Sequence, residues 1–232
     1  KKLKKFNIKW IRNINELKNE NNIFIANEFF DALPFKQFFK INNKWMERFV
    51  VLDKNNNKNF IKVDSNINKI EKELGFKISK NQKVIEFSPL ALNYLKNISK
   101  KIYHKKGCLL IIDYGYLEDE MKDTMMSIRK HKINNILNNI GNSDITYKLN
   151  FKFLKKITNN LKLKCQAITS QRNFLMSLGI EKRAEILSRN LPFSKKADIY
   201  YRLKRLIDKN QMGNLFKVML IKNKINKTKI GF

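Results

Sequence analysis

The sequence predicts an α/β fold in which a doubly wound sheet alternates with helices along the chain. The first observation is a set of short runs rich in apolar and β-branched residues, at 6–11, 23–27, 108–113, 163–169 and 215–221. Continuous apolar runs of this length are typical of strands covered on both faces. The second observation is that two amphipathic helical patterns lie between these runs, which favours helices packed on a buried sheet.

The two helical patterns are marked by their ends and by a single apolar face. In the first, Ser88 supplies an N-cap, Pro89 suits the first turn, and Gly107 favours a stop before the next strand. Its apolar face comprises Leu92, Leu95, Ile98 and Ile102. The second pattern covers 150–162, and its apolar face comprises Phe151, Leu154, Ile157 and Leu161.

Two segments interrupt the alternation of strand and helix. Residues 42–64 predict a β-hairpin insertion, because two β-rich runs flank a polar turn of three Asn residues. Residues 171–211 predict a helical insertion with a break at Pro192. We therefore expect one domain over 1–232 that carries both insertions.

The formal net charge is +29, which at face value indicates binding to nucleic acid or to an anionic membrane. Only eight of the 49 basic residues are Arg, and the Lys residues are scattered along the chain together with Asn and Ile. A nucleic-acid site more often shows clustered Arg with interleaved aromatic residues. We therefore attribute most of the charge to an AT-rich coding sequence and expect no nucleic-acid partner.

Composition also limits the chemistry that the chain can perform. No apolar run approaches the ~20 residues of a membrane-spanning helix, so we expect no membrane span. Cys108 and Cys165 lie in apolar runs and are expected to be buried thiols, not parts of a disulfide framework or a CxxC metal site. His104 and His131 have no partners at metal-ligand spacing, so no metal is expected.

Polar residues follow two of the predicted strands directly. Asn27, Glu28 and Asp31 follow the run at 23–27, and Asp113 and Tyr114 follow the apolar part of the run at 108–113. Ligands of open α/β sheets bind beyond the carboxyl ends of strands, so these side chains predict a polar pocket. The alternative is structural: Asp31 caps a short helix, Glu28 is a solvated loop residue, and Asp113 caps a turn.

At this point a family resemblance becomes specific. The string ANEFFDALP (26–34) resembles the signature of the MidA family, and six further landmarks of that family follow in the same order. They are WMER (45–48), EFSP (86–89), DYGY (113–116), DT with R-x-H (123–131), QRNFL with LGI (171–180), and MG with FKV (212–218). Each landmark alone is weak, but all of them in register cover most of the chain.

The resemblance implies a partial class I methyltransferase fold, Rossmann-like, with the β-hairpin insertion and a helical insertion that builds a substrate lid. It implies S-adenosyl-L-methionine as cofactor. It also implies a protein substrate, because the mitochondrial members are similar to symmetric protein-arginine methyltransferases that act on a complex I subunit. The implied location is the bacterial cytoplasm or the mitochondrial matrix. In the class I strand order 3-2-1-4-5-7-6, the four runs from 23–27 onward become strands four to seven.

The chain departs from the MidA pattern in two places. A family element with His and Asp appears here as GNSDITYKLNF (141–151), so that Lys148 and Asn150 stand at those positions. The family's glycine-rich cofactor loop would precede Lys1, and none of the seven glycines forms such a loop. The resemblance thus implies a methyltransferase domain without its N-terminal cofactor part. We expect these 232 residues alone to bind the cofactor weakly and to be inactive.

The residue roles follow from the chemistry of a guanidinium, which stays protonated with a pKa above ~12. Paired carboxylates bind its fork in bidentate fashion, so Glu28 and Asp31 are candidates for a catalytic clamp. His131 could accept the departing proton, although a lone His is more often structural. The weaker candidates are Glu86, Asp113 and Tyr114 at the pocket rim, and Asn27 toward the methionine moiety of the cofactor.

Two other functional classes stay open from the sequence. One is a non-catalytic assembly or interaction protein in which the same pocket binds a partner. The other is a basic nucleic-acid binder, whose affinity would fall steeply with salt. Loss of activity with retained partner binding on substitution of Glu28 would favour the enzyme.

Overall fold

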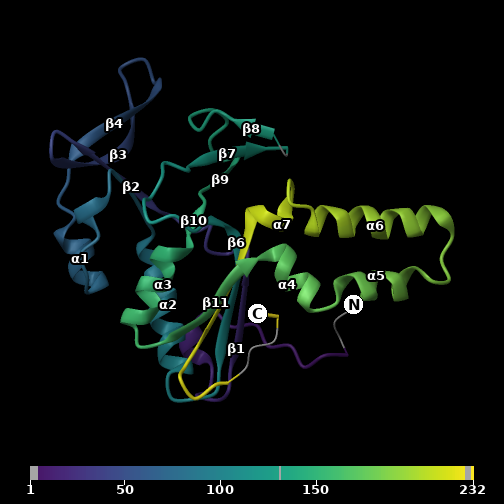
Figure 1. Ribbon diagram of the computed structural model, residues 1–232. Coiled ribbons are helices and arrows are strands. Elements are labelled where there is room, and N and C mark those ends of the chain that lie inside the picture. Colours follow the sequence, from purple (N-terminus) through teal and green to yellow (C-terminus); the bar gives the residue numbers. More distant parts are fainter. Residues whose placement is uncertain (1–4, 131, 228–230) are drawn as a thin grey trace.

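Residues 5–130, 132–227 and 231–232 are described by a computed structural model of the chain. The main sheet has the order β1-β6-β12-β11, made of β1 (Ile23–Asn27), β6 (Cys108–Tyr116), β12 (Phe216–Lys222) and β11 (Lys164–Ser170) (Figure 1). β1 is parallel to β6, whereas β12 is antiparallel to β6 and to β11. The short β10 (Leu149–Asn150) pairs in parallel with the carboxyl end of β6. The order confirms the predicted succession of strands four, five, seven and six.

The prediction of a strand at 6–11 is wrong. This segment is irregular, and Phe6 and Trp10 are 67% and 87% exposed. A strand needs a neighbour for its backbone N–H and C=O groups, and 6–11 has no ladder partner among the described residues. The first regular element is the short 3-10 helix η1 (Ile14–Glu16) that follows. An apolar, β-branched pattern therefore does not form a strand where no neighbouring strand offers its edge for backbone hydrogen bonds.

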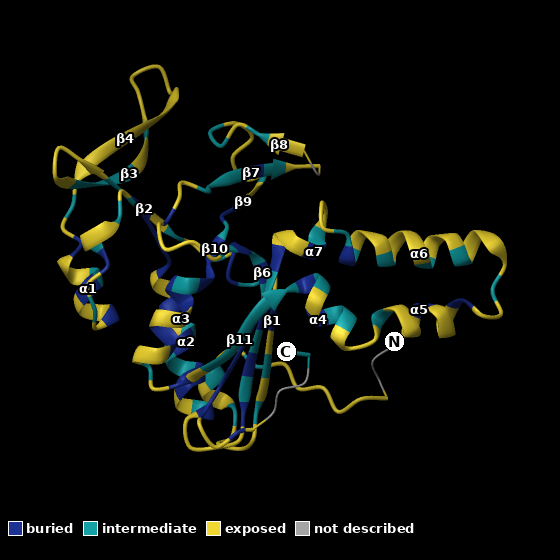
Figure 2. Cartoon of the chain, viewed as in Figure 1, coloured by how far each residue is buried: buried dark blue, intermediate teal, exposed yellow. Residues whose placement is uncertain are grey.

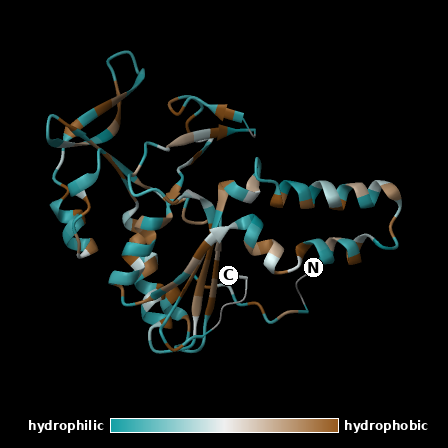
Figure 3. Ribbon diagram, in the orientation of Figure 1, coloured by the Kyte–Doolittle hydropathy of each residue, from teal (hydrophilic) through white to brown (hydrophobic). Residues whose placement is uncertain are grey.

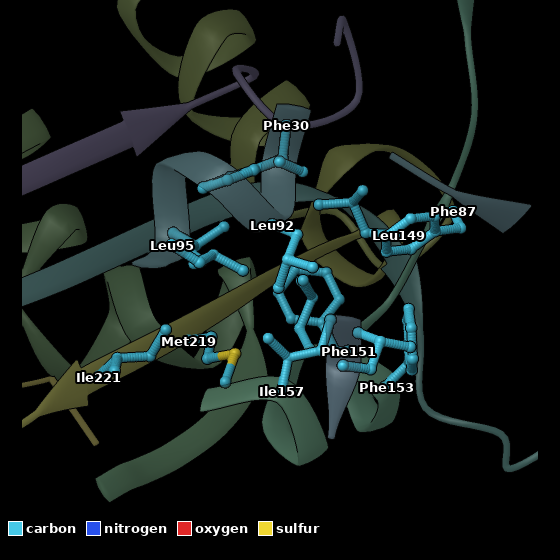
Figure 4. Close-up of a cluster of buried hydrophobic side chains, with 14 of the residues drawn as sticks. Phe30, Phe87, Leu92, Leu95, Leu149, Phe151, Phe153, Ile157, Met219 and Ile221 are labelled. Atoms are coloured by element: carbon cyan, nitrogen blue, oxygen red, sulfur yellow. The ribbon is translucent and has the colours of Figure 1, made fainter. Parts of the chain in front are cut away.

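One face of the main sheet is covered by the two predicted helices, α2 (Pro89–Ile102) and α3 (Phe151–Asn160). Ser88 accepts a hydrogen bond from the Ala91 N–H at 3.1 Å as N-cap of α2, and Asn150 caps α3 through the Phe153 N–H at 2.9 Å. Each fully buried large apolar side chain contributes about 1.5–3 kcal/mol, so this interface dominates the stability of the fold. Its packed side chains include Leu92, Leu95, Phe151, Ile157, Met219 and Ile221 (Figure 4).

The opposite face of the main sheet is covered less than the sequence pattern predicts. Side chains along β6 alternate between buried and half-buried, and Ile23 and Ile25 of β1 are 72% and 69% exposed (Figure 2). α4 (Gln171–Ser177) packs beside β11 and β12 on this sheet. The strands are nonetheless hydrophobic along most of their length (Figure 3). The prediction of cover on both faces therefore fails at β1 within the described part of the chain.

A second sheet has the order β4-β3-β2-β5, made of β4 (Lys58–Asp64), β3 (Lys44–Leu52), β2 (Lys36–Ile41) and β5 (Val84–Phe87). β3 and β4 form the hairpin expected from the sequence around 42–64, and the two short helices α1 (Asn68–Leu74) and η2 (Ser79–Asn81) lead on to β5. A third sheet, which the sequence did not predict, joins β8 (Lys132–Asn134), β7 (Met126–Arg129) and β9 (Asp144–Thr146). Both sheets lie beyond the upper end of the main sheet in Figure 1.

Residues 171–215 are helical, as the sequence predicts for 171–211. α5 (Ile180–Ser188) and α6 (Phe193–Ile207) lie side by side as an arm that projects from the sheet, and α7 (Met212–Leu215) leads back into β12 (Figure 1). Pro192 occupies the N-cap position of α6, where its fixed φ angle costs no helical hydrogen bond. Among the helices of the described residues, none is long and apolar enough to cross a membrane.

Glu71 in the middle of α1 holds the connection to β5 in place. Its Oε1 accepts hydrogen bonds from the backbone N–H of Ile78 and from the backbone N–H and the hydroxyl of Ser79, at 2.7–2.9 Å. Its Oε2 lies 2.9 Å from Lys77 Nζ. Burial alone would raise the pKa of Glu71, but the hydrogen bonds from Lys77, Ser79 and Ile78 outweigh it and lower the pKa to about 2.

Glu71→Gln should lower the free energy of unfolding by about 2 kcal/mol at neutral pH, because charge-assisted hydrogen bonds are lost. The carboxylate has a lower pKa folded than unfolded. Its contribution is therefore complete above the unfolded value of about 4.3 and is lost as the pH falls toward about 2. Urea unfolding at several pH values checks this. Lys77→Met removes the 75% exposed partner and should cost less than about 1 kcal/mol; an equal loss in both variants would contradict the assignment.

Candidate functional site

The parallel pairing of β1 with β6 brings the polar residues after both strands to one edge of the main sheet. The register pairs Asn27 with Ile112, and the Glu28 N–H continues the ladder by donating to the Ile112 carbonyl at 3.0 Å. Glu28 has φ +45°, a left-handed conformation that non-glycine residues adopt at a cost of roughly 1 kcal/mol. The chain therefore turns sharply at Glu28, and the turn exposes the Glu28 side chain at the edge of the sheet.

The Glu28 carboxylate is held by two neutral donors. The Tyr114 hydroxyl donates to Glu28 Oε2 at 3.1 Å, and Asn27 Nδ2 lies 3.5 Å from Oε1. The Tyr114 ring packs on Phe216, with ring centroids 4.3 Å apart. Burial, followed by the neighbouring Glu28 carboxylate, raises the pKa of Tyr114 to about 12. The hydroxyl therefore keeps its proton at neutral pH and acts as a hydrogen-bond donor to Glu28.

Glu28 and Tyr114 line an open hollow of about 1030 Å³. Its other wall comes from the end of α6 and from α7, in particular from the exposed side chains of Arg205 and Lys209. The remaining lining residues are Asn210, Gln211, Met212, Asn214, Leu215 and Phe216. The hollow thus has a carboxylate on the sheet side and two cations on the helix side.

Asp113 lies beneath this hollow and is fully buried. Its Oδ2 accepts hydrogen bonds from the backbone N–H groups of Phe30 and Asp31 at 3.1 and 3.3 Å, and its Oδ1 accepts from the Tyr114 N–H at 2.9 Å. Burial, followed by repulsion from Asp31, raises the pKa of Asp113 to about 8. The turn that carries Glu28 is therefore wrapped around the Asp113 carboxyl group.

Asp31 is also buried and does not line the hollow with Glu28. Its Oδ2 accepts from the Thr146 hydroxyl at 2.9 Å. Burial raises the pKa of Asp31, although hydrogen bonds from Thr146 and Asp113 partly oppose the rise. The sequence placed Glu28 and Asp31 together as one clamp. The structure brings Glu28 together with Tyr114 and Asp31 together with Asp113.

Glu86 of β5 lies in a separate polar network. Its Oε1 accepts from Gln37 Nε2 at 2.8 Å and from the Thr124 N–H at 2.9 Å, and its Oε2 accepts from the Thr124 hydroxyl at 2.6 Å. Gln37 in turn contacts Asp123 and Arg48, which form a 2.8 Å ion pair. Burial raises the pKa of Glu86. Glu86 lines a narrow cavity between α2 and α3, not the hollow of Glu28.

The other predicted residues have varied positions. His131 lies outside the residues that the structure describes. Asn150, at a departure from the MidA pattern, is the N-cap of α3, a role that Asp would also fill. Cys108 and Cys165 are free thiols that are half-buried instead of fully buried. No group of His, Cys, Asp and Glu in the described segments could hold a metal ion.

Arg205 and Lys209 are the lining residues that the sequence interpretation missed. The sequence predicted a helical insertion over 171–211 but not the point at which this segment rejoins the sheet. The missing information was the direction of the last strand, which is antiparallel to the strand at 108–113 and which the predicted strand order did not include. Phe216, the first residue of β12, consequently lies opposite Tyr114, so the residues just before it must stand at the carboxyl edge.

Comparisons with known proteins place the chain among methyltransferases. A family model described as "Putative S-adenosyl-L-methionine-dependent methyltransferase" matches residues 1–169. The mitochondrial protein arginine methyltransferase NDUFAF7 of Danio rerio is 27% identical over 216 residues, which cover 93% of this chain and 51% of that protein. The Caenorhabditis elegans homologue is 30% identical over 179 residues, which cover 76% and 42%. The chain therefore spans about half the length of the curated relatives it matches.

Two solved structures from Burkholderia thailandensis share the fold. One has a TM-score of 0.78 and 20% identity, and the match covers 94% of this chain and 60% of the chain in that structure. The other, solved with S-adenosyl-homocysteine bound, has a TM-score of 0.77 at 20% identity and covers 97% and 58%. These similarities confirm the predicted α/β methyltransferase fold.

The left-handed turn at Glu28 leads to a prediction about stability. Glu28→Gly should change the free energy of unfolding by less than about 1 kcal/mol, because relief of backbone strain offsets the lost hydrogen bond from Tyr114. Urea unfolding of the variant beside Asn56→Gly, at another left-handed turn residue, provides the measurement and its control. A loss well above 1 kcal/mol for Glu28→Gly would show that the glutamate is retained for stability.

Proposed function

This chain belongs to the S-adenosyl-L-methionine-dependent methyltransferase family whose model matches residues 1–169, and from that membership we propose that the whole protein methylates a protein arginine. The curated relatives support the choice of substrate, since those of Danio rerio and Caenorhabditis elegans are named protein arginine methyltransferases. A complex I subunit as the substrate is supported only by the MidA resemblance. The names of the relatives support a mitochondrial location if the source is eukaryotic, for which we propose the matrix, and the cytoplasm is proposed if it is bacterial.

The observation that carries the proposal is the Glu28 carboxylate in the open hollow. It is exposed, it is oriented by Tyr114, and it forms no ion pair with a cation of the described residues. A carboxylate that is fixed by neutral donors at a left-handed turn has no evident structural purpose. It is instead available to a cationic ligand that enters from solvent.

Glu28 would act on the guanidinium of the substrate by position and by charge. Its two oxygens match the planar fork of a guanidinium, so one contact fixes both the orientation and the plane of the group. The carboxylate also polarises the delocalised cation toward the nitrogen that attacks. Tyr114 keeps the carboxylate in one rotamer, because its hydroxyl remains protonated and donates to Oε2. Positioning of this kind supplies much of the acceleration in a two-substrate transfer.

The roles of the other predicted residues are proposed more narrowly. Asn27 is exposed beside Glu28 and could contact the methionine moiety of the cofactor, which supplies the methyl group when bound. His131 is proposed as the proton acceptor from its motif position. Glu86 and Asp113 would act on the site indirectly, through the hydrogen-bond networks that they form. Asp31 would be a clamp residue if its substitution abolished methyl transfer in a protein that still folds.

The glycines of this chain do not provide a cofactor cradle. A Cβ at Gly115 would approach Phe151 and the Leu149 carbonyl to under 3.0 Å, and one at Gly213 would meet the Ile207 carbonyl at 2.5 Å. These glycines therefore serve close packing of the protein on itself. Gly141 and Gly179 face open space at separate turns with positive φ. The residues present fit the cofactor only at the strand edge, so no further step is assigned to it.

Glu28→Gln should lower the rate of arginine methylation in the whole protein by about 100-fold, because a neutral amide neither orients nor polarises the guanidinium. Transfer of labelled methyl groups from S-adenosyl-L-methionine to protein in a cell extract is the measurement. The thermal midpoint should change little, since Glu28 is exposed. Tyr114→Phe should cause a smaller loss, about tenfold, through a less fixed carboxylate.

The matched control for this experiment is Glu181→Gln, an exposed glutamate on α5 away from the hollow, which should keep full activity. Retained activity in Glu28→Gln would remove Glu28 from the mechanism. Labelling of nucleic acid or of a small molecule alone would refute the arginine assignment. Binding of a partner protein without any methyl transfer would favour a non-catalytic assembly protein.

Calorimetric titration of the 232-residue chain with S-adenosyl-homocysteine should show no binding in the micromolar range. The physical reason is the absence of an open glycine cradle among the seven glycines, all of which the structure describes. Binding of one equivalent at micromolar affinity would mean that the hollow at Glu28 is itself the cofactor site.

A further inference from the structure

The carboxyl groups of Asp31 and Asp113 lie against each other in the protein interior. Asp113 has no exposed surface, Asp31 is 6% exposed, and the Asp31 N–H donates to Asp113 Oδ2 at 3.3 Å, which makes the two residues direct neighbours. No Lys, Arg or His of the described residues forms an ion pair with either carboxyl group. Two carboxylates without a cation are costly to bury, so the pair must reduce its charge in another way.

Three of the four carboxyl oxygens of Asp31 and Asp113 accept a hydrogen bond, and one does not. Both oxygens of Asp113 accept from backbone N–H groups, two at Oδ2 and one at Oδ1. Of the Asp31 oxygens, Oδ2 accepts from the Thr146 hydroxyl. Asp31 Oδ1 is fully buried and receives no hydrogen bond from any N–H or hydroxyl of the described residues. The neighbouring carboxyl group of Asp113 can satisfy Asp31 Oδ1 if one proton is held between the two groups, on either of them.

We propose that Asp31 and Asp113 share one proton at neutral pH, held between the two carboxyl groups, and that this acid pair fixes the turn that presents Glu28. The pair then holds a single negative charge, and every buried oxygen has a partner. The elevated pKa of Asp113, about 8, which burial and then the charge of Asp31 produce, agrees with this arrangement. Asp113 is a positioning residue in this account, because it contacts the turn and not the substrate.

The acid pair connects the strand ends with the third sheet. Asp113 of β6 holds the Phe30 and Asp31 N–H groups, and Thr146 of β9 fixes the rotamer of Asp31. The left-handed residue Glu28 lies at the start of the same turn. Loss of the shared proton would place two anions in contact beneath the turn, and repulsion would loosen the backbone that aims Glu28 at the hollow.

The charged and titratable groups that face the pair do not remove the need for a proton. Glu28 adds negative charge. Burial raises the pKa of Tyr114 and Tyr147, so both hydroxyls stay neutral, and Glu86 cannot supply a positive charge. Lys217 pairs with Asp113 in the β6–β12 register, but its ammonium group donates to the Asn214 carbonyl. The inference therefore rests on the buried geometry, and only its consequence for Glu28 rests on the proposed function.

The Asp31→Asn variant distinguishes between two roles of Asp31, sharing a proton with Asp113 and binding the substrate. The introduced amide can keep its oxygen on Thr146 and place its nitrogen where Oδ1 of Asp31 stands, as a donor to Asp113. Asp113 can then ionise without loss of the contact. A raised carboxyl pKa makes the folded state bind a proton that the unfolded state has released. Stability is therefore lost as the pH rises from the unfolded value near 4 to the folded value near 8.

The folding equilibrium constant of the unchanged chain should therefore fall relative to that of Asp31→Asn by nearly tenfold per pH unit between about pH 5 and about pH 8. Urea unfolding of both proteins across this range measures the ratio, in which most other titrations cancel. Infrared difference spectra should show a protonated carboxyl group at neutral pH that disappears in Asp31→Asn. Asp144→Asn, an exposed aspartate on β9, is the control and should change neither readout.

Parallel stability profiles, or no protonated carboxyl group at neutral pH, would overturn the shared proton. Should Asp31→Asn not fold, infrared spectra of the unchanged chain from about pH 5 to about pH 9 test the proton directly, because the band of the protonated carboxyl group must disappear near pH 8. In the whole protein, methyl transfer should decline above about pH 8, where the pair loses its proton, whereas the pH profile of Asp31→Asn should lack this decline relative to its own rate at neutral pH. Loss of transfer at every pH in a folded Asp31→Asn would make Asp31 a clamp residue, whereas absence of transfer in all proteins would refute only the proposed function.

Discussion

The site depends on one interaction, the parallel pairing of β1 with β6 in a register that ends both strands at the same edge. The last bond of that ladder, from the Glu28 N–H to the Ile112 carbonyl, fixes where the chain leaves the sheet. Asp113 then accepts from the N–H groups of Phe30 and Asp31 in the turn that follows, and Tyr114 reaches back to the Glu28 carboxylate. A slip of one residue would turn every side chain of β6 to the other face and would exchange the buried Asp113 carboxyl group with the half-buried Tyr114 phenol.

The antiparallel strand β12 completes the site from the other direction. Because Phe216 pairs with Tyr114, the chain enters β12 at the edge where β1 and β6 end, and the last turn of α6 and α7 form a wall there. Hydrogen bonds of Glu86 connect the second sheet with the third: Glu86 of β5 accepts from Gln37 of β2 and from Thr124, which lies just before β7. Regions far apart in the sequence thereby meet around two strand ends, which is the usual place for a ligand on an open α/β sheet.

The sequence predicted those parts of the fold that depend on local patterns. The four strands of the main sheet, α2 and α3 have apolar periodicity and capping residues that do not need a partner to be recognised. It failed at 6–11, because strand formation there depends on a neighbouring edge. It predicted that Glu28 and Tyr114 lie together, since both follow parallel strands. It did not predict the separation of Asp31 from Glu28, because a single left-handed residue decides which of the two faces solvent.

The charge of the whole chain constrains how such a site can work. A net charge of +29 repels an isolated cationic substrate over distances of about a Debye length, ~8–10 Å at moderate salt. Arg205 and Lys209 place two of these charges across the hollow from Glu28. If the substrate is a protein arginine, as proposed, its guanidinium would reach Glu28 more readily on a surface whose other groups are acidic, since these would offset the repulsion while the bidentate contact would select the arginine. Under the proposed function, the basic surface would favour an acidic protein partner, and the single oriented carboxylate would determine which of its side chains enters the site.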